Sequence, residues 1–332
     1  MNILIAYGTR PEFLKIKPLI DKMKDVISFK TVFTGQHKDI IDKNYLPDYK
    51  LNIIDNSNRL DSVLSSCLNN DDIFKNITHV LIQGDTTSAL GIAMSAFNRK
   101  IKVIHLEAGL RTYDLENPYP EEGNRQMISR ITDIHLCPTK NNKINLEEEC
   151  VNGDIYVVGN TGLDNLVEYK PKIIYENKIL ITLHRRENHD IIDKWFEELN
   201  HLAENNKDIE FILPLHPNPN VQKFKYILTH VNVIEPLDHK ELLNILVKCK
   251  FIISDSGGLQ EEASFLNKKI IVCRKVTERP ESLGLTSFYC KKYNDLKNIF
   301  NDVNTNYIVD VSSPFGDGYS SEKIIKILKN YE

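Results

Sequence analysis

The sequence predicts an α/β protein built from two doubly wound, Rossmann-like domains, and three observations support this fold class. The chain has 332 residues, which is long for a single hydrophobic core. Short apolar runs alternate with amphipathic segments almost from end to end. Most of these runs are continuously apolar, as in the strands of parallel sheets that helices cover on both faces.

The apolar runs fall into two sets, one in each half of the chain. We expect strands over 2–7, 29–34, 79–83, 102–107, 134–138 and 155–158, and then over 179–183, 209–215, 231–235, 251–254 and 269–273. Helical patterns lie between them, over 11–24, 87–98, 120–131, 191–205, 238–248 and 259–267. In the first helical pattern the apolar residues form one stripe, and Pro11 suits the first helical turn.

The boundary between the halves is predicted within residues 168–178, a polar stretch with one proline and no strong helical stripe. This gives an N-terminal domain over 1–168 and a C-terminal domain over 169–318. A final amphipathic helix over 319–332 can pack back on the N-terminal domain. Because ligands of open parallel sheets bind beyond the carboxyl ends of the strands, polar residues at those ends are the candidate site.

Composition and motif absences exclude several classes of protein. A net charge of −4 argues against a nucleic-acid-binding protein, which normally has a basic face. No apolar run approaches the roughly 20 residues of a membrane-spanning helix, and no signal peptide is recognisable, so we expect a cytoplasmic protein without a membrane partner. The six cysteines have neither zinc-site nor disulfide spacing. Neither bound NAD nor P-loop hydrolysis is expected, because GxGxxG does not follow the first strand and GxxxxGK[ST] is absent.

Two kinds of feature after the predicted strands suit a phosphate group. The run Asp255–Gly258 lies between an apolar run and a helical pattern, so its free backbone N–H groups favour phosphate. The alternative is an ordinary turn with Ser256 as the helix N-cap. Arg10 in GTRPE and Arg279 in TERPE carry guanidinium groups that suit a diphosphate. The alternative for each arginine is an ion pair with its neighbouring glutamate.

Carboxylates and histidines after other strands are candidates for proton transfer. For Asp85, helix capping and catalysis are equally open interpretations. Glu107 closes a buried strand, which is costly unless the carboxylate is paired or faces a pocket, so a site role is favoured. The pair Glu121–Glu122 begins a helix, where compensation of the helix dipole is a sufficient explanation. His184 can exchange a proton near neutral pH, whereas His216 precedes a proline and also suits an ordinary loop.

Ten strings together resemble the non-hydrolysing UDP-N-acetylglucosamine 2-epimerases, in the same order and over nearly the whole chain. They are GTRPE (8–12), GQH (35–37), GDTTS (84–88), EAGLRT (107–112), PEEGNR (120–125), GNTGLD (159–164), HRREN (184–188), HPNPN (216–220), SDSGGLQEEA (254–263) and TERPE (277–281). The resemblance implies the glycosyltransferase B fold with the active site in the interdomain cleft. It also implies UDP bound mainly by the C-terminal domain, a homodimer, and no metal or other cofactor.

The resemblance assigns roles to the matching residues and implies a reaction. The catalytic group comprises Asp85, Glu107, Glu121 and His184. The substrate-binding group comprises Arg10, Lys15, Arg125, His216, Ser256, Gly257, Gly258, Glu262 and Arg279, with the glutamate on the ribose hydroxyls. The enzyme removes UDP and the C2 proton together, giving a 2-acetamidoglucal, and then adds UDP back with a proton on the opposite face. UDP-N-acetylglucosamine and UDP-N-acetylmannosamine are thereby interconverted, with a carboxylate pair flanking C2 as acid and base.

The sequence departs from the family pattern at two places. Leu242 stands where the family usually has an aromatic residue, so an aromatic contact near the nucleotide is lost. Gln36 and His37 match a second UDP-N-acetylglucosamine site that activates bacterial members, but the arginine that completes this site has no clear counterpart near 56–66. We therefore expect weak activation or none.

Four other functions fit parts of the pattern. A hydrolysing 2-epimerase matches less well at GTRPE and EAGLRT. The same chemistry on another UDP-N-acetylated sugar, such as UDP-N-acetyl-L-rhamnosamine, stays open, because sugar-pocket residues are dispersed in the sequence. A glycosyltransferase is compatible with the fold, but it has no need of two carboxylates directed at C2. A catalytically inactive UDP-sugar sensor is disfavoured, because all four catalytic positions are present.

Overall fold

The computed structural model describes residues 1–37, 45–54 and 58–331. The chain divides into two compact units, and each is described here by itself. Unit 1 consists of Met1–Asn165 together with the last segment from Gly316 onward, and unit 2 consists of Leu166–Phe315. Among the described residues, no helix combines the length and the apolar character needed to cross a bilayer.

Unit 1 is built on a sheet whose strand order is β3-β2-β1-β4-β5-β6-β7, with every neighbouring pair parallel. The strands are β1 (Asn2–Tyr7), β2 (Ser28–Phe33), β3 (Tyr49–Lys50), β4 (His79–Gln83), β5 (Lys102–Leu106), β6 (Ile134–Cys137) and β7 (Asp154–Val157). The helices are α1 (Arg10–Met23), α2 (Arg59–Leu68), α3 (Thr87–Asn98), α4 (Glu121–Arg130), α5 (Lys140–Glu148) and α11 (Ser320–Leu328).

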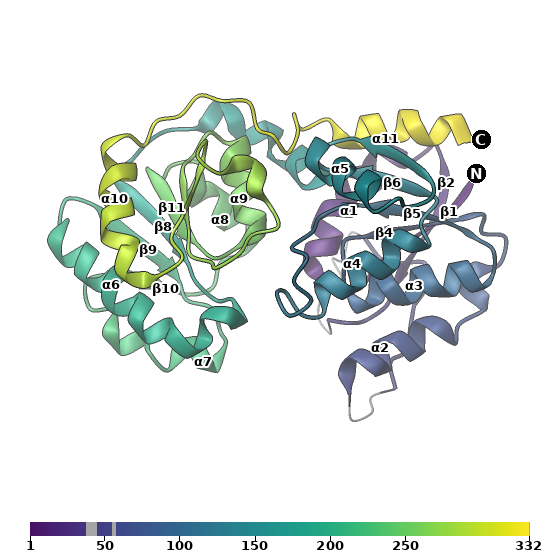
Figure 1. The fold of residues 1–332 in the computed structure, drawn as a ribbon, viewed down its shortest axis with the longest axis horizontal. Coiled ribbons are helices and arrows are strands. Elements are labelled where there is room, and N and C mark those ends of the chain that lie inside the picture. The colour runs from purple at the N-terminus through teal and green to yellow at the C-terminus, as the bar shows by residue number, and fades with distance from the viewer. Residues whose placement is uncertain (38–44, 55–57, 332) are drawn as a thin grey trace. The chain divides into compact units, whose positions relative to one another are not determined.

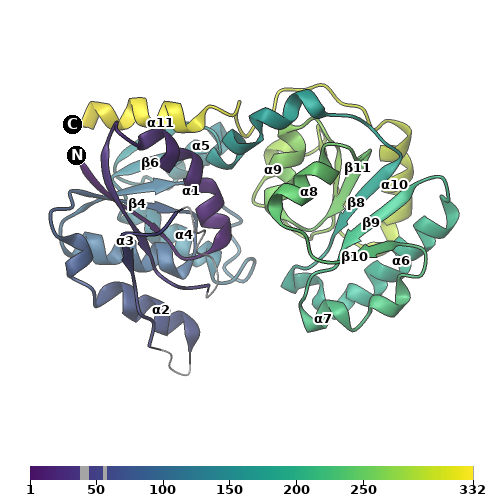
Figure 2. The same cartoon turned by 180° about the vertical axis from the view of Figure 1, so that it is seen from behind.

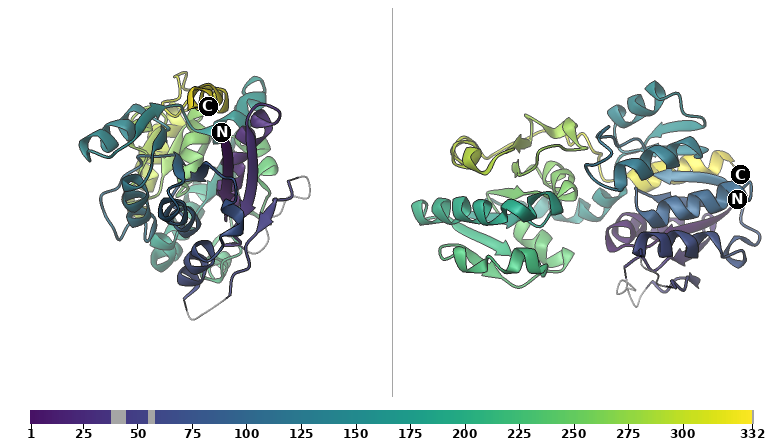
Figure 3. Two further views of the ribbon diagram at one scale, coloured as in Figure 1. Left: turned by 90° about the vertical axis from the view of Figure 1, so that its right-hand side faces the viewer. Right: turned by 60° about the horizontal axis from the view of Figure 1, so that its bottom comes forward.

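Helices cover both faces of this sheet (Figures 1 and 2). Alternate residues of β1 point to opposite faces, so Ile3 and Ile5 pack with α1 and α11, whereas Leu4 packs with α2 and α3. This two-sided burial explains why β1 reads as a continuous apolar run. The first strand and the last helix of the described chain lie side by side in the views of Figures 1 and 3.

Unit 2 repeats this topology in a sheet of order β10-β9-β8-β11-β12-β13, again with parallel pairs. Its strands are β8 (Lys178–Thr182), β9 (Glu210–Pro214), β10 (Asn232–Ile234), β11 (Phe251–Ser254), β12 (Ile270–Val272) and β13 (Ser287–Tyr289). Its helices are α6 (Ile192–Asn205), α7 (Pro219–Gln222), α8 (His239–Leu246), α9 (Gly257–Phe265) and α10 (Leu296–Thr305). Helices α6 and α10 pack on one face through Trp195 and Phe300, and α8 and α9 lie on the other (Figure 2).

The strand orders place one topological switch point in each sheet. In unit 1 it lies between β1 and β4, and in unit 2 it lies between β8 and β11. The chain leaves adjacent strands there in opposite directions, so the turns after them leave room for a ligand. The stretch expected to be a linker differs from the prediction at its start, because Thr161–Lys172 forms a 3₁₀-helical segment.

Candidate active site

The turn after β1 is tied to the turn after β4 by Glu12, a residue of α1. Its carboxylate accepts the backbone N–H groups of Gly8 and Thr9, at 3.0 and 2.6 Å, and the hydroxyl of Thr86 at 2.8 Å. Burial raises the pKa of the Glu12 carboxyl to about 7, although these hydrogen bonds oppose the rise. Arg10 is exposed in the same turn. Glu12 therefore fixes the loop that presents Arg10.

Asp85 lies in the turn after β4, where capping and catalysis were both open interpretations. The N-cap of α3 is Thr86, whose side chain accepts the N–H of Ala89. The Asp85 carboxylate instead accepts from the Arg125 guanidinium, with its Oδ2 2.7 Å from Nε. Asn124 donates to the backbone carbonyl of Asp85 at 2.8 Å. The carboxylate is thus available for chemistry and is oriented by an arginine.

Glu107 follows β5 on the neighbouring strand and leaves it with a φ of +66°. Both of its oxygens lie 2.5 Å from Nζ of Lys15, and the amide of Gln83 donates to Oε2. The residue is 9% exposed, so these donors offset the cost of burying its carboxylate. A Cβ placed on Gly84 would stand 3.7 Å from Oε2 of Glu107. Asp85 and Glu107 therefore occupy adjoining turns, each with its own cation.

Helix α4 supplies the support of this pair. Glu122, which is fully buried, accepts from the Arg125 guanidinium at 2.9 Å and from the N–H of Thr112 at 3.0 Å. Burial acts to raise the pKa of Glu122, but its hydrogen bonds and Arg125 outweigh burial and the pKa is lowered. Glu121 begins the helix and is partly buried. Neither Glu122 nor Gln83 was selected from the sequence as a site residue. A signal for Gln83 was present, because it is a polar residue at the end of the buried strand HVLIQ.

The pair matched to the activator site contacts the first turn of α3 and the turn after β1. The side-chain oxygen of Gln36 accepts the N–H and the hydroxyl of Ser88, at 3.0 and 2.8 Å. His37 donates its N–H to Gly8, and burial lowers the pKa of its imidazole. An arginine does lie beside this pair, because Arg59 at the start of α2 donates to the carbonyl of Gly35 at 3.0 Å. Arg59 is therefore a candidate for the arginine that completes the matched site.

In unit 2, the turns after β8 and β11 are joined by Asp255, which is fully buried. Its carboxylate accepts the backbone N–H groups of His184 and Arg185, both at 2.9 Å, and the side-chain amide of Asn188 at 3.0 Å. The His184 ring stacks on His216 with centroids 5.0 Å apart. Burial lowers the pKa of His184, partly opposed by Asp255. His184 is therefore a mainly neutral imidazole at neutral pH, in a fixed loop.

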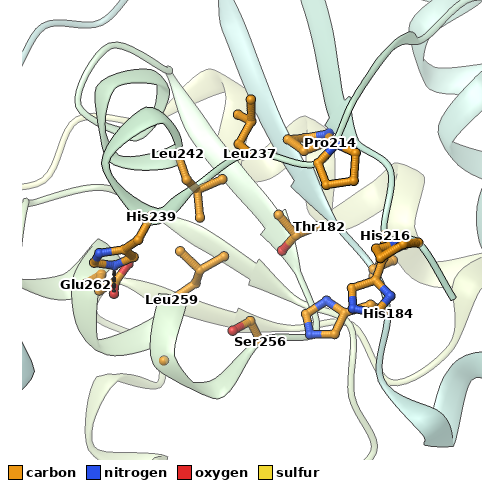
Figure 4. Close-up of a pocket in the computed structure, with 14 residues that line it drawn as sticks. Thr182, His184, Pro214, His216, Leu237, His239, Leu242, Ser256, Leu259 and Glu262 are labelled. Atoms are coloured by element: carbon orange, nitrogen blue, oxygen red, sulfur yellow. Dashed lines mark hydrogen bonds and ion pairs between the residues drawn. The ribbon is translucent and has the colours of Figure 1, made fainter. Parts of the chain in front are cut away.

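These residues border a pocket of about 310 Å³ in unit 2. Figure 4 shows His184, His216 and Ser256 on one side and the hydrogen-bonded pair His239 and Glu262 on the other. Leu242 and Leu259 lie between these two polar groups in the view. The pocket is lined by Thr182, Leu183, His184, Pro214, His216, Pro217, Pro236, Leu237, His239, Leu242, Ser256, Gly258, Leu259 and Glu262. The lining therefore has an apolar part between two polar groups.

Arg279 is 6% exposed and lies beneath the glycine turn that begins α9. A Cβ on Gly257 would stand 2.6 Å from a guanidinium nitrogen of Arg279, so only glycine leaves room for the arginine. The guanidinium donates to the carboxylates of Glu261 and Glu278. The alternative of an ion pair with a neighbouring glutamate is therefore what the structure contains. The ion pairs of Arg279 therefore hold its guanidinium against the glycine turn and fix that turn.

The fold and the two sets of residues define an α/β enzyme with cation-held carboxylates in one doubly wound unit and a nucleotide-sized pocket in the other. A family model described as UDP-N-acetylglucosamine 2-epimerase matches residues 21–329. The chain belongs to this UDP-N-acetylglucosamine 2-epimerase family, as the ten sequence strings predicted.

Relatives and solved structures agree with this assignment. The UDP-N-acetylglucosamine 2-epimerase of Campylobacter jejuni is 38% identical, over 98% of this chain and 97% of the relative. That of Bacillus subtilis (strain 168) is 34% identical, over 99% and 95%. The structure of the Neisseria meningitidis enzyme bound to UDP-GlcNAc has a TM-score of 0.89 at 31% identity, covering 99% of this chain and 100% of that one. These comparisons confirm the predicted family.

A more distant structure bears on the fold alone. MurG from Acinetobacter baumannii has a TM-score of 0.59 at 9% identity and covers 99% of both chains. The fold class predicted from the sequence, two doubly wound domains of the glycosyltransferase B type, is confirmed.

Proposed function

We propose that this chain interconverts UDP-N-acetylglucosamine and UDP-N-acetylmannosamine by inverting C2 of the sugar. The proposal rests above all on one observation, the carboxylates of Asp85 and Glu107 on adjoining turns, held by Arg125 and Lys15 respectively. Each carboxylate is oriented by a cation beside it, and a general acid or base has to be held in position to transfer a proton. Related proteins with UDP-N-acetylglucosamine bound, such as the one from Neisseria meningitidis, support the choice of substrate.

The reaction we propose is an elimination followed by an addition, with no net oxidation. One carboxylate takes the C2 proton while the C1–O bond to UDP breaks, and the electron pair of the C–H bond forms the C1=C2 bond of 2-acetamidoglucal. UDP oxygen then adds to C1, and the other carboxylic acid gives a proton to the opposite face of C2. Such acid–base assistance contributes about 10²–10⁴-fold to rate. Glu121 and His184 complete the proposed catalytic group.

The departing UDP needs cations and N–H donors, because negative charge builds up on its diphosphate. We assign this role to the exposed guanidinium of Arg10 in unit 1 and to the turn at Ser256 in unit 2. Glu262 is assigned to the ribose. For Arg279, the buried pairs with Glu261 and Glu278 favour a supporting role over direct contact with phosphate.

The test is incubation of the purified protein with UDP-N-acetylglucosamine in heavy water, followed by proton NMR. The proposal requires deuterium at C2 together with new signals of the manno sugar. If UDP-N-acetylglucosamine gives neither result and UDP-N-acetyl-L-rhamnosamine exchanges its C2 proton, the alternative substrate is established. Release of free N-acetylmannosamine would instead indicate the hydrolysing reaction.

The proposal includes a homodimer and a cytoplasmic location, as inferred from the resemblance and from the sequence respectively. Analytical ultracentrifugation tests the first, with a single species at twice the chain mass of 38.3 kDa as the expected result. Cell fractionation tests the second.

A further inference from the structure

His105, which the sequence did not single out, contacts the turn that carries Asp85. It lies in β5, on the same strand that leads into Glu107, and its side chain is buried. Its Nε2 lies 2.7 Å from the backbone carbonyl oxygen of Gly84. Because a carbonyl oxygen can only accept, Nε2 carries the hydrogen and donates it. A side chain of β5 therefore binds the backbone immediately before the aspartate that follows β4.

The backbone at Gly84 depends on such a contact. Gly84 has a φ of +71° and no side chain, so no steric contact of its own restricts it to this conformation. Its N–H still follows the sheet and donates to the carbonyl of Leu106 at 2.9 Å, whereas its own carbonyl accepts from His105. Because a peptide group is planar, a fixed oxygen of Gly84 also fixes the N and Cα atoms of Asp85. The histidine therefore sets the point from which the Asp85 side chain extends.

A contact in the opposite direction joins the same two turns. The amide of Gln83, the last residue of β4, donates to Oε2 of Glu107. Strand β4 thus holds the side chain of Glu107, and the neighbouring strand β5 holds the backbone before Asp85. Two groups that act on one carbon atom need this kind of fixed separation, because catalytic groups work only within about 0.5 Å of the productive geometry.

The state of the His105 ring suits a support and not a proton carrier. Burial lowers the pKa of His105 to about 3, so the imidazole is neutral near neutral pH. Its Nε2 hydrogen is engaged by Gly84, and Nδ1 is buried without a hydrogen-bond partner in the described part of the chain. The ring therefore keeps one tautomer and one hydrogen bond while the carboxylates exchange protons.

We propose that His105 is a positioning residue, which fixes the backbone at Gly84 and thereby holds Asp85 at the separation from Glu107 that inversion of C2 requires. This inference rests on the proposed function, because it takes the two carboxylates as the acid and the base. Without the Nε2 donor, the peptide after Gly84 can turn and Asp85 moves with it. A misplacement of about 1 Å can cost about 100-fold in rate.

His135 offers a matched control on the neighbouring strand β6. It is the register partner of His105, is fully buried, and donates from Nε2 to the carbonyl of Asn152 at 2.9 Å. Burial lowers the pKa of this imidazole as well, and its Nδ1 also lacks a partner among the described residues. Asn152, however, precedes β7 and lies beside no proposed catalytic residue in the sequence. The two histidines thus share strand position, burial and hydrogen bonding, and differ in the segment that they hold.

The experiment measures kcat and KM for UDP-N-acetylglucosamine, together with the Kd of UDP by calorimetry. His105→Phe keeps a ring but has no donor, and it is expected to lower kcat about 10- to 100-fold with KM and the Kd of UDP nearly unchanged. His105→Gln, whose amide nitrogen reaches about as far as Nε2, is expected to recover most of the lost kcat. His135→Phe loses an equivalent hydrogen bond and is expected to keep the kcat of the wild type.

The outcomes separate this inference from the proposed function and from a general loss of stability. Melting curves first establish that each variant is folded at the assay temperature. The inference is overturned by a wild-type kcat in His105→Phe, by equal losses in His105→Phe and His135→Phe, or by a His105→Gln protein as slow as His105→Phe. If His105→Phe does not fold, His105→Leu decides the matter, because its smaller apolar side chain also lacks the donor and is expected to show the same loss. The proposed function fails separately, through absence of C2 deuteration in the wild-type protein.

Discussion

The buried carboxylate of Glu12 makes the stability of unit 1 depend on pH in a predictable direction. Its pKa is 4.5 in a solvated chain and is raised to about 7 in the folded protein, mainly by burial. Between these values the unfolded chain has lost the Glu12 proton and the folded protein keeps it. Stability from this group is therefore fully present below pH 4.5 and is lost as the pH rises toward 7.

The size of this loss follows from the two pKa values. At ~1.4 kcal/mol for each step of one pH unit, the interval from 4.5 to about 7 corresponds to about 3 kcal/mol. Glu12→Gln removes the titration and conserves the shape. Its amide oxygen can accept the N–H groups of Gly8 and Thr9, and its NH₂ can donate to the hydroxyl of Thr86.

The assay is amide hydrogen exchange of peptides from β1 and α3, which reports the opening free energy of unit 1 by itself. The difference in opening free energy between wild type and Glu12→Gln is expected to change by about 3 kcal/mol between pH 4.5 and 7, with the wild type losing stability. Glu148→Gln, at an exposed glutamate of α5, is the matched control and should follow the wild type. Curves for wild type and Glu12→Gln that stay parallel within about 0.5 kcal/mol refute the reasoning.

Three further predictions concern other residues. Asp85→Asn and Glu107→Gln should each lower kcat by about 10²–10⁴-fold and leave UDP affinity nearly unchanged. Turnover within about tenfold of wild type would show that the substituted residue is not the general acid or base. Arg279→Ala removes a guanidinium from the buried carboxylates of Glu261 and Glu278, although Arg274 still pairs with Glu278. The variant should lower the unfolding free energy of unit 2 by about 3 kcal/mol, measured through the fluorescence of Trp195, and an unchanged urea midpoint contradicts this. The third prediction concerns activation, measured as progress curves that start from UDP-N-acetylmannosamine. The wild type should show a lag that a trace of UDP-N-acetylglucosamine abolishes, whereas Arg59→Ala should keep its lag. A wild type without any lag disproves activation.

Much of the fold was predictable because parallel sheets leave a strong pattern in the sequence. Strands buried on both faces must be apolar throughout, and β1, β4 and β11 were accordingly located to within a residue. Helix α2 was missed because its buried face includes Ser62 and Ser66 beside Val63 and Cys67, which weakens the apolar stripe. Strand β13 was missed because Ser287–Tyr289 begins with a serine and does not form the continuous apolar run that marked the equally short β12.

The turns of the candidate site were also predictable, whereas the pairing within them was not. Asp85, Glu107 and the glycine turn at 257–258 follow from the rule that ligands bind at strand ends. Which guanidinium meets which carboxylate depends on distances between segments far apart in the chain. Arg125 lies 40 residues from the Asp85 that it holds, and nothing in the local sequence distinguishes it from a surface arginine.

The return of the chain to unit 1 imposes an order on folding during synthesis. Unit 2 is complete once residue 315 has left the ribosome, whereas the core of unit 1 still lacks Ile324 and Leu328 of α11. Until those residues arrive, the face of the sheet around Ile3 and Ile5 is only partly covered, and exposed apolar surface of this kind favours aggregation. In the nascent protein, the core of unit 2 is therefore completed first. The core of unit 1, which carries Asp85 and Glu107, is completed last.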